Sequence, residues 1–142
     1  MEWRDQGLAL LPLGTLFSAV RLPGPLVRAL AASVDPEDID AFLGEALKGG
    51  PVIHGPEGRR YYALVPPGTT LDWRAPAAAC LGDGTYLGVP RTDLTELEAH
   101  ASGSYWAVPF TRPGWLCKTA DVLALVTVAG GLAREDGSEE KS

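Results

Sequence analysis

The stretch from Gly50 to Trp73, GPVIHGPEGRRYYALVPPGTTLDW, decides the fold of this chain. A short apolar run at 51–54 precedes the turn-forming residues 55–58, and residues 60–65 then bring aromatic and β-branched side chains. Two prolines at 66–67 end the second run, because proline cannot donate a hydrogen bond to a neighbouring strand. The pattern predicts a β-hairpin at the centre of the fold.

Upstream of this hairpin, the sequence predicts two strands and two helices. The apolar runs 8–13 and 16–22 predict two buried strands joined by a tight turn. Residues 26–32 predict a short helix, and Asp35 predicts the N-cap of a longer one. The spacing of the longer helix places Ile39, Phe42, Leu43, Ala46 and Leu47 on its packed face and Asp40, Glu45 and Lys48 outward.

Downstream, turn residues again separate apolar runs. Gly82–Asp83–Gly84 between residues 77–81 and 85–90 predicts a second hairpin, and residues 69–76 predict a loop or single helical turn in which Trp73 folds back on the core. Residues 105–110 predict the last strand. The remaining predicted element is a final helix that Thr119 caps and that runs to about residue 129.

Helices placed between strands and hairpins predict an α+β domain with a mixed or antiparallel sheet and helices packed on one face. We expect a single domain over residues 1–130 and a disordered acidic tail over residues 131–142. No targeting segment or long apolar run is present, so we expect a cytoplasmic protein without a membrane anchor.

Composition excludes several kinds of site. The net charge of −6 disfavours a protein held on nucleic acid by phosphate contacts. Cys80 and Cys117 match no zinc-binding spacing and are expected to be buried free thiols. His54 and His100 favour structural roles, because no nucleophile lies at a recognisable spacing from either. No phosphate-binding or dinucleotide motif occurs, so no cofactor and no metal are expected.

Several short motifs, taken together, suggest a family. They are LLPLGTLFSAVRLPG at 10–24, GPVI and YYALVPPGT within 50–69, CLGDGTYLGVP at 80–90 and YWAVP at 105–109. With these motifs the chain resembles small actinobacterial proteins similar to the N-terminal domain of bifunctional DNA primase/polymerases, the prim-pol domain.

The resemblance implies a polymerase fold whose catalytic groups are missing here. Active prim-pol domains carry two metal-binding acids after an early strand, because two Mg²⁺ ions must neutralise the triphosphate. The matching position, Phe17–Arg21, contains no carboxylate. The family's serine–x–histidine element is matched by residues 58–62, which hold arginine and tyrosine instead. Asp83, between two glycines, resembles the acid-and-glycine turn before the family's last strands and is a candidate binding residue, although ordinary turn chemistry also accounts for it. One acid cannot replace a two-metal site, so we expect no polymerase activity.

Three functions stay open. The first is a catalytically inactive binding or regulatory module for a protein partner, with Arg59, Arg60, Tyr61 and Tyr62 in its recognition surface. Alternatively, the two tyrosines simply alternate between core and surface and the arginines are solvated. The second is a nucleotide or single-stranded nucleic-acid binder, in which these aromatic and basic residues stack a base and hold a phosphate. The third is an enzyme of a specialised pathway, with a cavity under Trp73, Tyr86 and Trp106.

Overall fold

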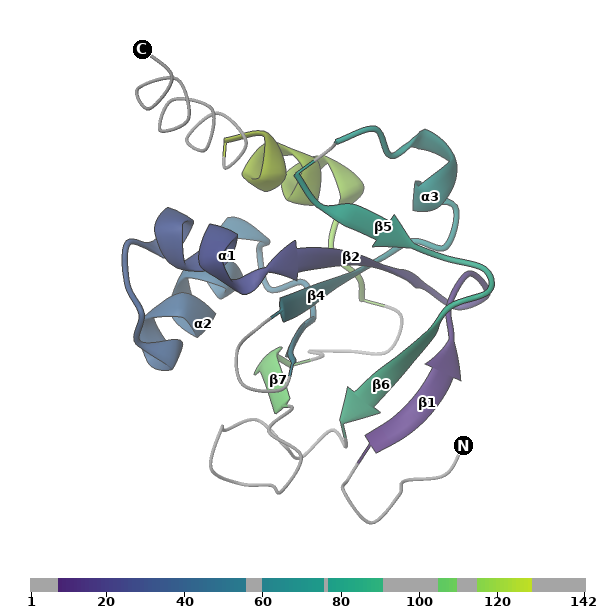
Figure 1. Ribbon diagram of the computed structural model, residues 1–142, viewed down its shortest axis with the longest axis horizontal. Helices are drawn as coiled ribbons and strands as arrows, with labels where there is room; N and C mark the ends of the chain where they lie inside the picture. Colours follow the sequence, from purple (N-terminus) through teal and green to yellow (C-terminus); the bar gives the residue numbers. More distant parts are fainter. Residues whose placement is uncertain (1–7, 56–59, 76, 91–104, 110–114, 129–142) are drawn as a thin grey trace.

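A five-stranded antiparallel sheet lies at the centre of the computed structural model, which describes residues 8–55, 60–75, 77–90, 105–109 and 115–128 (Figure 1). Its strands, in spatial order, are β5 (Ala79–Leu81), β2 (Ser18–Pro23), β4 (Arg60–Val65), β3 (Val52–His54) and β7 (Tyr105–Val108). A separate two-stranded ribbon pairs β1 (Leu8–Pro12) with β6 (Tyr86–Pro90). The helices are α1 (Gly24–Ala31), α2 (Pro36–Ala46), α3 (Thr69–Asp72) and a segment we call the 119–128 helix. The predicted α+β class is confirmed.

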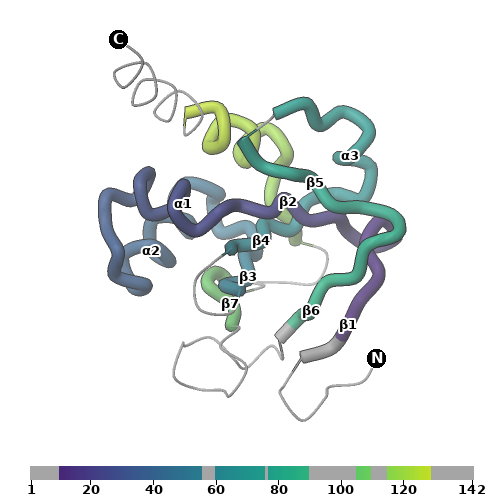
Figure 2. Tube along the Cα trace, viewed as in Figure 1, coloured from purple at the N-terminus to yellow at the C-terminus, as the bar shows by residue number. Residues whose placement is uncertain are grey.

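The hairpin predicted around residues 50–73 is formed by β3 and β4, and it occupies the middle of the sheet (Figure 2). Val52 lies opposite Ala63, and His54 lies opposite Tyr61. Strand β4 ends directly before the two prolines, as expected from their missing N–H groups. Most of the predicted turn falls in residues 56–59, outside the described residues.

Local capping groups set the ends of α2. The Asp35 carboxylate accepts a hydrogen bond from the Glu37 N–H at 2.9 Å, which confirms the predicted N-cap. Beyond the helix, Lys48 and Gly49 adopt positive φ angles of 54° and 80°, and glycine allows this left-handed conformation without strain. The helices predicted near residues 26–32 and from Thr119 onward are also present.

Two apolar cores lie on opposite faces of the central sheet, because successive strand residues point to opposite sides. The helix-side core lies between the sheet and the helices and includes Val20, Leu22, Leu43, Tyr61, Ala63, Val122 and Val126. The ribbon-side core lies between the sheet and the β1–β6 ribbon and comprises Leu13, Phe17, Ala19, Ile53, Leu64, Leu87, Val89 and Trp106. Helices therefore cover one face, as predicted, and the ribbon covers the other.

One predicted strand pairing, the second hairpin, is wrong, and the two N-terminal strands do not pair with each other. Strand β1 pairs with β6 and not with β2, because β4 and β5 already occupy both edges of β2. Strands β5 and β6 do not form a hairpin, since the turn at residues 82–84 carries the chain from one sheet to the other. The run 8–13 is also not buried throughout, because Leu10 on the ribbon is 65% exposed.

Some predictions concern residues outside the described ranges. The proposed tail at 131–142 is one of them, as are residues 1–7 of the proposed domain. Within the described part of the chain, none of the helices has the length and apolar character required to cross a membrane.

Candidate functional site

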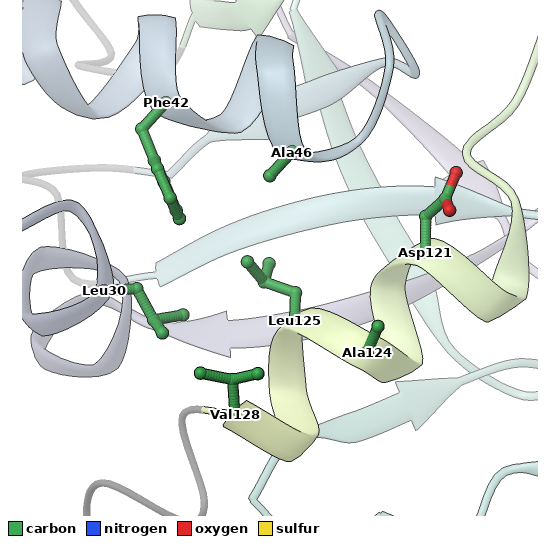
Figure 3. Close-up of a pocket in the computed structure, with 7 residues that line it drawn as sticks. All are labelled: Leu30, Phe42, Ala46, Asp121, Ala124, Leu125 and Val128. Carbon is green, nitrogen blue, oxygen red and sulfur yellow. The ribbon is translucent and has the colours of Figure 1, made fainter.

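A groove of about 380 Å³ lies on the helix side of the molecule, where α1, α2 and the 119–128 helix meet (Figure 3). We call it the three-helix groove. The side chains of Leu30, Phe42 and Leu125 point into the space between the helices, and Asp121 lies at the opposite end. The described residues that line it are Leu30, Phe42, Ala46, Asp121, Ala124, Leu125 and Val128. Its surface is therefore apolar except for one carboxylate.

The spacing of side chains along the helices explains this lining. Phe42 and Ala46 lie one turn apart on α2, and the 119–128 helix contributes residues three or four positions apart. Ala46 and Ala124 carry only methyl groups. The space between α2 and the 119–128 helix is consequently left unfilled.

The groove is open to solvent along the 119–128 helix. Leu125 is only 8% exposed and forms part of its floor, whereas Val128 at its rim is 58% exposed. An apolar side chain of another molecule can therefore contact the floor while the rest of that molecule stays outside.

Asp121 gives the groove its single charged end. Its Oδ1 lies 3.5 Å from Nζ of Lys48, whose side chain is 69% exposed, while the Asp121 side chain is 17% exposed. Its Oδ2 is buried and has no hydrogen-bond partner among the described residues. A buried acceptor without a donor is unfavourable. Because Oδ2 is covered, a bound group can contact only the exposed part of the Asp121 side chain.

A second polar cluster lies between α2 and the sheet. The Tyr105 hydroxyl donates a hydrogen bond of 2.8 Å to Oδ2 of Asp40. The His54 ring stacks on Tyr105 at a centroid distance of 4.5 Å and meets the edge of Tyr61 at 5.0 Å. The prediction that Asp40 points outward is wrong, because β7 brings Tyr105 against α2.

Burial dominates the electrostatics of this cluster. It raises the pKa of Asp40 from its usual 3.8 to about 6; the Tyr105 hydrogen bond opposes this effect, and the charge of Glu37 adds to it. Burial, reinforced by the Asp40 charge, also raises the pKa of Tyr61 to about 12. Perturbed pKa values often mark active sites. Here, however, Tyr61 and Tyr105 are 1% exposed and His54 is 3% exposed, so a substrate cannot reach them.

The residues predicted to form a recognition surface on the hairpin are divided between the two faces of the sheet. Tyr61 is buried in the helix-side core, whereas Tyr62 is half-buried against the ribbon-side core. Arg60 is exposed at the start of β4, and Arg59 lies outside the described residues. The arrangement is the alternation expected from the period of two along a strand.

The three aromatic residues predicted to surround a cavity are not brought together. Trp73 packs against the helix-side core, and its Nε1–H donates to the carbonyl of Ala78 at 2.8 Å. Trp106 is buried in the ribbon-side core, on the other face of the sheet. Tyr86 is 65% exposed on the ribbon.

Asp83 and the cysteines occupy structural positions. The Asp83 carboxylate lies against Gly14, where φ is +97° and a Cβ atom would meet that side chain. Cys80 and Cys117 are free thiols, and only Cys117 is fully buried. Among the described residues, no three His, Cys, Asp or Glu side chains are grouped so that they could hold a metal ion.

Sequence reasoning missed the groove, although it placed part of its lining correctly. The predicted apolar faces of two helices include Phe42, Ala46 and Leu125. The signal for a site would have been Asp121, an acid beside the apolar face of the last helix. The gap itself depends on how three helices meet, and no single segment contains that information.

Comparison of the chain with protein-family models, curated proteins and solved structures gives no match.

Proposed function

We propose that this chain is a catalytically inactive binding module, related to the prim-pol domain, that docks a protein partner in the three-helix groove. The observation that carries the proposal is the groove itself, which is apolar, open to solvent and about 380 Å³ in volume, with Asp121 at one end. Concave apolar surfaces with one or two directed polar groups are typical binding sites.

The open side of the groove favours a protein partner over a small molecule. Pockets for small molecules enclose most of the surface of their ligands. Here Val128 is 58% exposed at the rim, so a bound molecule would keep much of its surface in water. A partner protein needs only one or two anchoring side chains in such a depression, with the surrounding contacts made outside it.

The two alternative functions have less support. A protein of net charge −6 repels phosphate, and Tyr61 and Trp106 are each 1% exposed and cannot stack on a base. An enzyme would need catalytic side chains that a substrate can reach. The polar cluster around Asp40 has perturbed pKa values, but its buried neighbours keep a substrate away from it. Asp121 is the one titratable side chain among the described residues that line the three-helix groove, and the cation beside it, Lys48, is 69% exposed.

The proposed prim-pol relationship supports the inactive character of the module. Strand β2 corresponds to the strand that precedes the metal-binding acids of active relatives. In this chain the Ser18 hydroxyl is buried and donates to the carbonyl of Pro67 at 2.9 Å, and Ala19 and Val20 fill the two cores. The residues of β2 thus serve packing.

Site-specific photocrosslinking in cells that naturally produce the protein tests the proposal. A photoreactive residue at Val128 should give a discrete crosslinked band, whereas the same residue at Leu10, exposed on the ribbon across the sheet, should not. A third variant adds Ala124→Trp to the Val128 position, fills the groove and should remove the band. Identical band patterns from Val128 and Leu10, or a band that survives Ala124→Trp, would refute docking in the groove.

A further inference from the structure

We infer that Asp121 makes the three-helix groove selective for a basic segment, in which the aliphatic stem of a lysine or arginine lies in the groove and its cationic head binds the carboxylate. This inference rests on the proposed function and adds the chemistry of the partner. It follows from the hydrogen bonding of the Asp121 carboxylate, from the charge of the chain and from the shape of the groove.

The carboxylate of Asp121 has unused capacity for hydrogen bonds. Its only ion pair among the described residues is with Lys48, at 3.5 Å, and exposed pairs of this kind are weak. Its buried Oδ2 accepts no hydrogen bond within the described part of the chain. A position in the first turn of the 119–128 helix suits an acid electrostatically, but that effect leaves the oxygen lone pairs free. A guanidinium or ammonium group supplies donors to the exposed part of this carboxylate.

The surrounding charges favour a cation. The exposed acids of α2 include Glu37, Asp38 and Glu45, and the whole chain carries a net charge of −6. Although Lys48 lies beside Asp121, the negative charge of the whole chain favours the approach of basic segments over acidic ones.

The shape of the groove suits a long side chain with a charged end. Leu30, Phe42 and Leu125 supply apolar contacts at one end, and Asp121 lies at the other. Lysine and arginine place their methylene groups along apolar surfaces while the charged head reaches a polar site. At about 380 Å³ the groove is at the small end of the range for ligand sites, about 300–1,000 Å³, which fits one or two side chains.

Three six-carbon probes with different heads test the inference: hexylammonium, hexan-1-ol and hexanoate. Each is titrated into the full-length protein while NMR follows the methyl groups of Leu125 and Val128. Hexylammonium should bind about fivefold more tightly than hexan-1-ol, as expected for one partly exposed ion pair, and hexanoate should bind most weakly. The preference for hexylammonium should shrink as salt is added, and this measurement needs no variant.

A pair of isosteric substitutions separates the effect of the Asp121 carboxylate from the effect of the net charge of the protein. Asp121→Asn should remove the preference for hexylammonium over hexan-1-ol. Asp72→Asn removes the same charge from an exposed position on α3 and should preserve the preference. Loss of the preference in both variants would overturn the role of Asp121.

The outcomes also distinguish this inference from the proposed function. Equal affinities of the wild type for hexylammonium and hexan-1-ol would overturn selectivity for cations and leave docking in the groove intact. If none of the three probes moves the methyl signals of Leu125 and Val128, the groove does not accept apolar groups, and both proposals fail.

Discussion

Asp40 should make the stability of this protein depend on pH in a direction opposite to that of a salt-bridged acid. Its pKa is raised to about 6 in the folded state, mainly by burial, while the unfolded chain keeps a value near 3.8. Between these values the folded state binds more protons than the unfolded state, so the free energy of unfolding falls as pH rises. The stabilisation is complete below pH 3.8 and is lost as pH rises through about 6.

The size of the effect follows from the two pKa values. Their difference, from 3.8 to about 6, corresponds to an upper limit of ~3 kcal/mol at 1.36 kcal/mol per pKa unit. Asp40 is only partly buried, and solvent screening reduces this figure to about 1 kcal/mol. The groups that act on Asp40 are Tyr105, through its hydrogen bond, and Glu37, through its charge.

Urea unfolding at pH 5 and pH 7.5 measures the prediction in wild type and Asp40→Asn. Asparagine keeps an oxygen for the Tyr105 hydroxyl and removes the charge. The variant should gain about 1 kcal/mol relative to wild type at pH 7.5 and less at pH 5. Titrating groups that do not interact with Asp40 contribute equally to both proteins and cancel in the comparison. A constant difference between the two proteins at both pH values would refute the assigned pKa.

Four further substitutions test the packing, a helix cap and a turn by urea unfolding. Leu43→Ala, in the helix-side core, should cost about 2–5 kcal/mol, whereas Leu10→Ala, on the exposed ribbon face, should change stability by less than about 0.5 kcal/mol; similar losses at both sites would contradict the assigned burial. Asp35→Ala removes the N-cap of α2 and should cost about 1 kcal/mol, with no loss expected if the cap were incidental. Gly14→Ala places a Cβ atom against Asp83 at a φ of +97° and should cost at least about 1 kcal/mol; a neutral result would mean that the turn relaxes freely.

The elements that could be predicted are those whose causes lie within a few residues. Asp35 accepts from an N–H two residues away, and Pro66 ends β4 through its own missing donor. The period of two along β4 likewise accounts for the separation of Tyr61 and Tyr62. These parts of the fold depend on local stereochemistry, which a sequence displays directly.

The elements that could not be predicted depend on distant residues. An apolar strand such as β1 can pair with any free edge, and the choice of β6 follows only after β4 and β5 have occupied both edges of β2. Asp40 lies on a helical position that periodicity assigns to solvent, yet Tyr105, 65 positions later in the chain, covers it. The three-helix groove has the same origin, since it exists only after three separate helices are placed.

Stability alone does not explain the residues that form the groove. A larger apolar side chain at the half-buried Ala46 would fit the helical pattern and bury more surface, at about 25 cal/mol per Å². A sequence shaped only by stability would therefore fill the groove. Asp121 leads to the same conclusion, because its buried Oδ2, unpartnered among the described residues, destabilises the fold in a way that an apolar side chain would not. Small alanines and an under-used carboxylate at one place are features that the proposed docking of a partner would explain.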